Sequence, residues 1–279
     1  MAKNNSFRLK LTELKERSLY ILMSPVRFAK FLLMVTGFFT WLVLFILLLI
    51  VLNFFNSLPK IEKMSFQDIK KQAIKTTTAR YETKKLTKNY FWVEGPKISR
   101  YLMYAIVMSE DGQFFEHEGI DYNAVINSFA NNLKQREYAS GGSTLTQQVV
   151  KNIFLTNEKS LERKLREYFI SKSLEQNLTK NKILELYLNI AEFGPDIYGV
   201  GQASLHYFGK SAEKITASEG AFLALMLPSP RKHYLSIYKN EYLSEKNRKK
   251  LRRILRDMLH LEYISPEQYQ AALKYKYFK

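Results

Sequence analysis

The sequence predicts a mainly α-helical protein with a single N-terminal transmembrane helix, and three observations support that fold class. Residues 31–52 form one uncharged, apolar run. After this run, apolar residues recur at three- and four-residue spacing, which is typical of helices with one buried face. Strand-like alternation is scarce, and we expect at most a small hairpin at residues 113–119. The predicted helices cover residues 98–108, 122–133, 161–178, 180–190, 217–227 and 246–260.

The apolar run has the length of a membrane-spanning helix. At about 1.5 Å per residue, residues 31–52 cross the roughly 30 Å of hydrocarbon in a bilayer. The run is too long for the apolar part of a signal peptide, and the residues after it, from Asn53 to Asn56, contain no small-x-small cleavage site. We therefore expect an uncleaved membrane anchor.

The charges that flank this run predict its orientation. Residues 1–30 hold seven Lys or Arg and two acidic residues. Positive charge is retained on the cytoplasmic side, so the N-terminus should be cytoplasmic and the rest of the chain extracytoplasmic. The predicted domains are a basic cytoplasmic tail (1–30), the transmembrane helix (31–52), a polar juxtamembrane connector with some helix (53–96) and a folded domain (97–279).

The composition restricts the kind of partner. The 279 residues include 43 Lys or Arg and 26 Asp or Glu, a net charge of +17, which indicates a polyanionic partner. Nucleic acid fits this charge but does not fit the predicted extracytoplasmic side, whereas a lipid phosphate or a wall polymer fits both. There is no cysteine, which excludes disulfides, a Cys-ligated zinc site and a thiol nucleophile.

A carboxylate pair follows the apolar helix predicted at 98–108. Glu110 and Asp111 begin a dense polar segment that runs to Gly119. A carboxylate at the end of an apolar helix is partly desolvated, and desolvation raises its pKa toward the range of a general base. The alternative is an ordinary solvated acidic loop.

A second polar segment contains paired glutamines. Gly141 and Gly142 precede Ser143, which we expect to cap a helix. On that helix Ser143, Gln147 and Lys151 would share one face at four-residue spacing. Such a face suits sugar hydroxyls and a phosphate, although an exposed polar face with no ligand remains the alternative. The candidate binding residues of this segment are Ser143, Thr144, Gln147, Gln148, Lys151 and Asn152.

Two further segments complete the pattern. Arg163, Lys164 and Glu167 form either a routine ion pair at i, i+4 or a carboxylate surrounded by cations that bind a diphosphate. Residues 180–189 carry an apolar stripe and are expected to be mostly core.

Together and in this order, these motifs resemble the peptidoglycan glycosyltransferases of glycosyltransferase family 51. The resemblance covers roughly residues 97–272, and one departure is Lys159, which stands where many members carry Arg. The matching patterns are E-D-x-x-F-x-x-H-x-G, G-x-S-T-x-T-Q-Q, R-K-x-x-E, K-x-x-I-L-x-x-Y-x-N and Y-G-x-x-x-A.

The resemblance implies a lysozyme-like, two-lobed helical domain that polymerises lipid II into β-1,4-linked glycan strands in cell wall biogenesis. It implies an enzyme of glycosyl transfer, here in a monofunctional form without a transpeptidase domain. No cofactor is required, and a divalent cation, Mg²⁺ or Mn²⁺, is allowed. The implied catalytic residues are Glu110, as general base, and Glu167. The implied substrate-binding residues are Asp111, Ser143, Thr144, Gln147, Gln148, Lys151, Asn152, Lys159, Arg163 and Lys164.

The expected partners are lipid II, the growing glycan strand and the cytoplasmic (inner) membrane, with other peptidoglycan synthases or division proteins as further candidates and no nucleic acid. Two alternatives remain open at this point. A lysozyme-like hydrolase or lytic transglycosylase would share the helical fold, although cleaving a glycan requires no cluster of cations for a diphosphate. A non-catalytic membrane scaffold of wall synthesis would tolerate replacement of Glu110 and Glu167.

Overall fold

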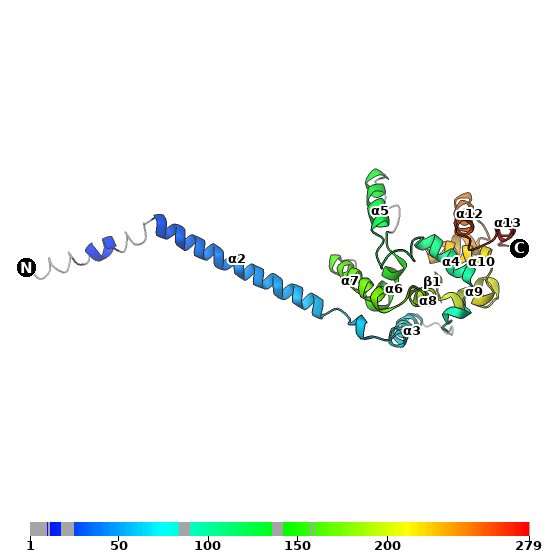
Figure 1. Cartoon of the computed structure of the whole chain (residues 1–279), viewed down its shortest axis with the longest axis horizontal. Coiled ribbons are helices and arrows are strands. Elements are labelled where there is room, and N and C mark those ends of the chain that lie inside the picture. Colours follow the sequence, from blue (N-terminus) through cyan, green and yellow to red (C-terminus); the bar gives the residue numbers. More distant parts are fainter. Residues whose placement is uncertain are drawn as a thin grey trace, which may run out of the picture. The chain divides into compact units, whose positions relative to one another are not determined.

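The chain consists of two compact units, residues 1–58 and 59–279. The computed structural model describes residues 10, 12–17, 25–83, 90–135, 142–156, 158 and 160–278. Figure 1 shows a long helix in the first unit and a group of shorter helices in the second.

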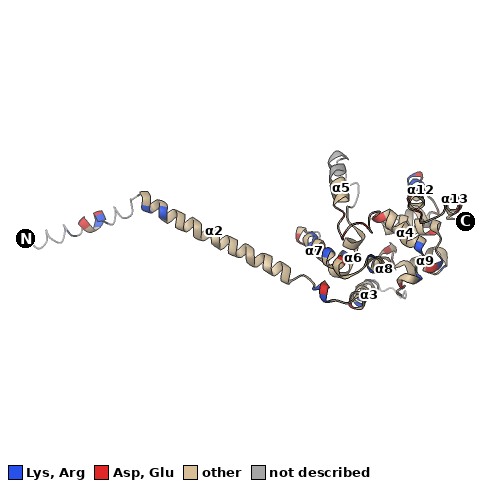
Figure 2. Cartoon of the chain, viewed as in Figure 1, with Lys and Arg blue, Asp and Glu red and all other residues tan. Residues whose placement is uncertain are grey.

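The first unit contains helix α2 (Pro25–Asn56), which is long and apolar enough to cross a membrane. Its basic residues lie near its start, and the rest of the helix is uncharged (Figure 2). The hydroxyl of Thr36 donates to the Leu32 carbonyl at 2.9 Å, and that of Thr40 to the Thr36 carbonyl at 2.8 Å. These bonds satisfy the polar groups within the helix, as a hydrocarbon environment requires. The prediction of one apolar N-terminal helix is confirmed.

The second unit is almost entirely helical, which confirms the predicted fold class at the level of secondary structure. Its α-helices are α3 (Phe66–Thr83), α4 (Arg100–Glu110), α5 (Tyr122–Gln135), α6 (Leu145–Phe154), α7 (Leu161–Asn177), α8 (Lys180–Ile190), α9 (Val200–Phe208), α10 (Ala217–Met226), α11 (Pro230–His233), α12 (Glu245–His260) and α13 (Pro266–Leu273). Short helical turns lie at η1 (Ile61–Lys63), η2 (Gly95–Lys97), η3 (Ala212–Lys214) and η4 (Tyr234–Lys239). The lysozyme-like, two-lobed arrangement stays a prediction.

Two buried helices organise the core. Every residue of α10 is buried, and α10 packs against α4 on one side and against α12 and α13 elsewhere. From Ile183 onward α8 is buried as well, and it packs against α6, α3 and α7. Helices that are buried on nearly all sides lie in the middle of a protein, so these two form the centre around which the other helices pack.

Helices α4 and α10 approach each other very closely. A side chain at Gly220 of α10 would place its Cβ atom 3.0 Å from the Cα atom of Leu102 and 3.0 Å from the carbonyl oxygen of Tyr101. Because both of these atoms belong to the backbone of α4, only glycine allows the two helices to approach this closely. The contact fixes α4, the helix that ends at Glu110.

The structure differs from the sequence-based expectations in two places. Residues 113–119 form turns, and the hairpin lies instead at β1 (Glu192–Gly194) and β2 (Ile197–Tyr198), an antiparallel pair. The segment expected as a connector, 53–96, differs too, because α3 packs on α6 and α8 within the second unit. Its polar composition hid the buried apolar side chains of Ile61, Ile69 and Ala73.

We predict that Gly220→Ala lowers the stability of the protein. Alanine favours a helix over glycine by about 1 kcal/mol, but overpacking against a backbone that cannot yield costs about 1–3 kcal/mol. The expected net loss is about 1 kcal/mol in the denaturant unfolding of the full chain in detergent. Gly112→Ala is the control, since a Cβ atom at that position would have no neighbouring atom within 4 Å. A Gly220→Ala protein more stable than the native one would contradict the close contact.

Candidate active site

Glu110 is the last residue of α4 and lines a cavity of about 360 Å³. The cavity lies between the end of α4, the first turns of α5 and the loop that precedes α6. Ser143 and Thr144 of that loop line it together with Asp121 and Asn127. A carboxylate from the predicted catalytic pair therefore faces a space that can hold a ligand.

The environment of Glu110 raises the pKa of its carboxyl group. Desolvation by burial is the main cause, and the charge of Asp111 adds to it, while Lys250, Gln148 and Ser109 act in the opposite direction. Its hydrogen bonds are weak, because the Gln148 Nε2 atom and the Ser109 Oγ atom each lie 3.5 Å from a carboxylate oxygen. A desolvated carboxylate with few strong donors suits a general base.

Lys250 of α12 is a charged neighbour of Glu110 that the motifs did not reveal. Helix α12 packs against α4. Burial lowers the pKa of the Lys250 ammonium, and the charge of Glu110 opposes that shift. The sequence held one signal: Lys250 directly precedes Leu251 and stands four residues before Ile254, both buried, so it borders the inner face of α12.

Tyr187 of α8, the tyrosine of the motif at residues 180–189, is a neutral neighbour of Glu110. Its side chain is buried, as expected for the apolar stripe at 180–189. Desolvation raises the pKa of its hydroxyl well above the usual value, and the charges of Glu110 and Asp111 raise it further. The core helix therefore reaches the two carboxylates at the end of α4.

Glu167 of α7 is a buried carboxylate held by two cations. It is 2% exposed. Arg163 Nη1 donates to one of its oxygens at 2.8 Å, and Lys164 Nζ donates to the other. Lys164 Nζ also lies 3.3 Å from the Ser143 hydroxyl, which lines the cavity beside Glu110. The structure thus brings the second and third motifs together, and Glu167 orients the two cations.

Lys151 interacts electrostatically with the group formed by Arg163, Lys164 and Glu167, and with a further cation, Arg80. Desolvation lowers the pKa of Lys151, and the charges of Arg163, Lys164 and Arg80 lower it further, whereas Glu167 opposes them. Arg80 belongs to α3, within the segment expected as a connector, and its Nη2 atom donates to the backbone carbonyl of Asn152 at 3.1 Å. We name Arg80, Lys151, Arg163 and Lys164 the cation cluster. Lys159 lies outside the described residues.

The start of α6 corrects the expected helix cap. Thr144, not Ser143, is the N-cap residue, and Gln147 completes a capping box with it. Thr-x-x-Gln is the pattern that such a box requires, so Ser143 precedes the helix and does not share a face of it with Lys151. Both Thr144 and Gln147 are buried, and their contacts hold the helix; their role in binding substrate stays a prediction.

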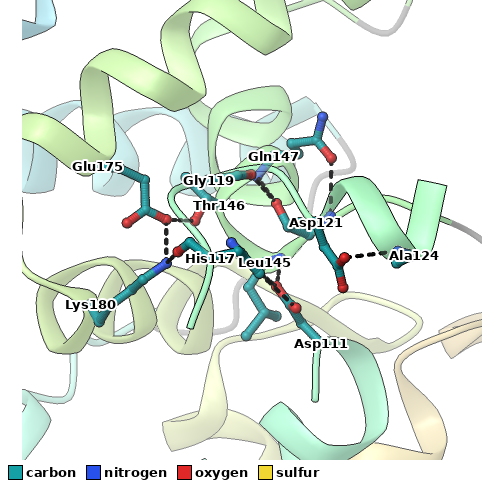
Figure 3. A network of polar contacts seen from close by, with 11 residues as sticks. Asp111, His117, Gly119, Asp121, Ala124, Leu145, Thr146, Gln147, Glu175 and Lys180 are labelled. Carbon is teal, nitrogen blue, oxygen red and sulfur yellow. Dashed lines mark hydrogen bonds and ion pairs between the residues drawn. The ribbon is translucent and has the colours of Figure 1, made fainter. Parts of the chain in front are cut away.

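Asp111, the residue after Glu110, has a structural role: it links the end of α4 to the start of α6. Its carboxylate accepts hydrogen bonds from the backbone N–H of Leu145, at 2.9 Å, and faces His117 Nε2 at 3.0 Å (Figure 3). A carboxylate at the N-terminus of a helix is favoured by the helix dipole and by unpaired N–H groups. Asp111 thereby fixes the end of α4 to the start of α6.

A second set of contacts holds the loop after Asp111. Lys180 Nζ donates to the His117 carbonyl at 2.5 Å and to Glu175 at 2.8 Å, and it lies 4.5 Å from the centre of the Phe114 ring. The Thr146 hydroxyl donates to the same Glu175 oxygen at 2.5 Å (Figure 3). Residues of the first, second and fourth motifs therefore form one scaffold around the cavity.

The donor groups do not favour a metal ion at Glu167. Among the residues that the structure describes, no three His, Asp or Glu side chains gather as a metal site would require. Both Glu167 oxygens already accept hydrogen bonds from cations. These contacts indicate that Glu167 orients the side chains of Arg163 and Lys164.

We predict that Asp111→Ala destabilises the protein by about 2–3 kcal/mol, because the buried Leu145 N–H and His117 Nε2 lose their partner. Chemical denaturation of the full chain in detergent measures the loss. Glu118→Ala, in the same loop, is the control and should stay within about 0.5 kcal/mol of the native protein, since its side chain is 90% exposed. Equal stabilities of the two variants would argue against the anchoring role of Asp111.

Comparison with known proteins places this site in a family. A family model described as Transglycosylase matches residues 75–259. The biosynthetic peptidoglycan transglycosylase of Nitrosomonas eutropha is 44% identical over 140 residues, which are 50% of this chain and 57% of that protein. The protein of the same name from Nitrosospira multiformis is 42% identical over 157 residues, 56% of this chain and 68% of that one.

Penicillin-binding protein 1A of Aquifex aeolicus is 38% identical over 183 residues, 66% of this chain and 24% of that protein. The match thus spans little more than half the length of the first of these relatives, and a quarter of the last. The matched region of the family model contains Glu110, the scaffold around it and the cation cluster. Because that model covers well over half of the 279 residues, the chain belongs to the transglycosylase family.

Proposed function

We propose that this protein polymerises lipid II into β-1,4-linked peptidoglycan glycan strands and releases undecaprenyl diphosphate. One observation carries the proposal: the cavity that Glu110 lines also contains Ser143, and the Ser143 hydroxyl lies beside Lys164 of the cation cluster. A base in the cavity wall, and a wall residue in contact with a cation of the cluster, match the two needs of glycosyl transfer from a sugar diphosphate. Family membership and the names of the relatives support the same activity.

The reaction that fits this arrangement is a single inverting displacement. Glu110 takes the proton from the 4-hydroxyl of the acceptor sugar, and the hydroxyl oxygen forms a bond to the anomeric carbon of the donor. The bond from that carbon to the diphosphate breaks, and the diphosphate leaves with the bonding electrons. An α-linked donor then gives a β-linked product. As in inverting glycosidases, base and leaving group stand on opposite sides of the reacting carbon.

The cation cluster stabilises the leaving diphosphate. Charge-assisted hydrogen bonds strengthen as negative charge develops on the phosphate oxygens. Lys151, Arg163 and Lys164 supply these bonds, and we assign Arg80 and Lys159 to the same role. Glu167 keeps Arg163 and Lys164 in place through its buried carboxylate.

The neutral residues of the cavity wall position the sugars. Ser143 and Gln148 carry donors and acceptors beside the cation cluster and Glu110 respectively. The proposed binding set is completed by Asp111, Thr144, Gln147 and Asn152. The first three contribute mainly by hydrogen bonds that hold the backbone at the start of α6 in place. No metal ion or other cofactor is required for this mechanism.

The anchor α2 gives this chemistry a location. We place the N-terminus in the cytoplasm and the second unit on the outer side of the cytoplasmic membrane, where the lipid tail of the substrate can stay in the bilayer. Val125 and Ile126 of α5 are exposed apolar side chains beside the cavity wall and fit contact with that lipid. The growing strand, other peptidoglycan synthases and division proteins are the expected partners.

We predict that Glu110→Gln nearly abolishes polymerisation of lipid II and leaves its binding measurable, because the amide keeps the shape of the carboxyl group but cannot accept a proton. General base catalysis accounts for about 10²–10⁴-fold in rate, so a loss of at least about a hundredfold is expected. Gel analysis of labelled lipid II products measures turnover, and tracer displacement measures binding.

Glu116→Gln is the matched control, since Glu116 is exposed in the same loop. Near-normal polymer formation by Glu110→Gln would refute the role of Glu110. Products shorter than the substrate, released from preformed glycan by the native protein, would indicate a hydrolase or lytic transglycosylase instead. Wall synthesis that continues normally after substitution of both Glu110 and Glu167 would indicate a scaffold.

We predict that Lys250→Met shifts the acid limb of the pH–rate profile to higher pH. Glu110 acts as a base only when ionised, so the rate falls as pH decreases through its pKa. Lys250 lowers that pKa, and its removal raises it. The pH dependence of kcat/KM measures the shift, and Lys249→Met, at an exposed neighbouring position, should leave the limb in place. An unchanged profile for Lys250→Met would exclude this coupling.

A further inference from the structure

Helix α12 carries an unusual concentration of positive charge. Its 16 residues include seven basic and two acidic side chains. The apolar residues Leu251, Ile254, Leu255 and Met258 are buried and attach the helix to the core. Apart from Lys250, the basic residues therefore lie on the faces that the core leaves open.

Four of these cations form a continuous row. Lys246, Lys249, Arg253 and Arg256 follow one another at spacings of three, four and three residues, which places them on one side of the helix, and all four are exposed. We name them the α12 basic stripe. With the described residues as possible partners, only Arg256 has an ion pair, with its neighbour Asp257 at 3.6 Å.

The stripe is electrostatically unfavourable for the isolated protein. Lys249 and Arg253 are like charges at i, i+4, and such pairs destabilise a helix. Other arginines have an acidic partner on their own helix: Arg166 pairs with Glu162 in α7, and Arg252 pairs with Glu245 in α12 outside the stripe. A face that served solubility alone would alternate its signs as α7 does. An anionic partner removes the repulsion on α12.

We propose that the α12 basic stripe binds the headgroups of anionic phospholipids. The side chains at the two ends of the helix favour a lipid surface over a soluble anionic polymer. Tyr242, just before α12, is 60% exposed, and Leu261, just after it, is 46% exposed. Tyrosine and leucine beside a row of cations are typical of a surface that lies in the interface of a membrane.

The same helix connects this surface to the cavity. Lys250 follows Lys249 of the stripe in sequence, and its charge acts on the Glu110 carboxyl. Binding of headgroups by the stripe would hold the rim of the cavity at the level of the membrane surface. This contact adds to the anchor α2, and it does not depend on the proposed activity.

A single fluorescent label on the full chain tests the proposal. The sequence has no cysteine, so His260→Cys, at the exposed last residue of α12, gives one labelling site. The labelled protein is reconstituted into phosphatidylcholine vesicles with or without phosphatidylglycerol, with a trace of lipid that carries a quencher on its headgroup. We expect stronger quenching with phosphatidylglycerol, and a loss of this difference at high salt, since salt screens exposed charges.

Neutralising the stripe supplies the decisive comparison. A basic residue near an anionic membrane contributes about a fivefold factor to binding, so replacing Lys246, Lys249, Arg253 and Arg256 with Gln should weaken docking by roughly six-hundredfold and remove the quenching. The control replaces four exposed lysines elsewhere, Lys71, Lys75, Lys214 and Lys276, with Gln. It changes the net charge equally and should keep the quenching.

Three results would overturn the proposal. One is quenching that does not depend on phosphatidylglycerol, and another is equal quenching by the stripe variant and the control. The third is a label that responds to soluble poly(glycerol phosphate) and ignores lipid composition, which would assign the stripe to a wall polymer. The thermal unfolding temperature of each variant shows whether it is folded. The stripe variant should unfold no earlier than the native protein, because its substitutions leave the buried face of α12 unchanged. If the stripe variant melts early, Lys249→Gln with Arg253→Gln repeats the test.

Discussion

The buried carboxylate of Asp111 is the interaction on which the arrangement of the site depends. It directly follows Glu110 and accepts the first N–H of α6, so the end of one helix is fixed to the start of another. His117 packs against the same carboxylate, and the His117 carbonyl receives Lys180. As a result, Glu110 is positioned by the backbone at the end of α4 and not by hydrogen bonds of its side chain. The side chain of Glu110 keeps only two long contacts and stays available for proton transfer.

Three carboxylates of the site, Glu110, Asp111 and Glu167, therefore have three different tasks because their surroundings differ. Glu110 is desolvated by burial and accepts only weak hydrogen bonds from Ser109 and Gln148, which raises the pKa of its carboxyl group. Asp111 is saturated by a helix N-terminus and a histidine. Glu167 is saturated by Arg163 and Lys164. This separation by environment is the general means by which proteins assign base and support roles to chemically similar groups.

The sequence predicted the helices and the main polar residues of the site, because helical periodicity and short motifs are local signals. Glu110, Lys164 and Glu167 were found in this way, and so was the apolar helix α2. Lys250 and Arg80 were not, since each reaches the site through packing between helices distant in sequence. The expected Ser143 cap failed for a local reason: Thr144 competes for the same position and has Gln147 to complete its box.

The missing side chain at Gly220 has a consequence for the geometry of Glu110. The contact of Gly220 with Tyr101 and Leu102 lies near the beginning of α4, and Glu110 ends the same helix eight residues further on. Since an α-helix rises about 1.5 Å per residue, that contact is the pivot of a stiff rod about 12 Å long. The far end of this rod is held by Asp111 at α6, so a methyl group in α10 would strain the contacts beside Glu110 without touching the cavity.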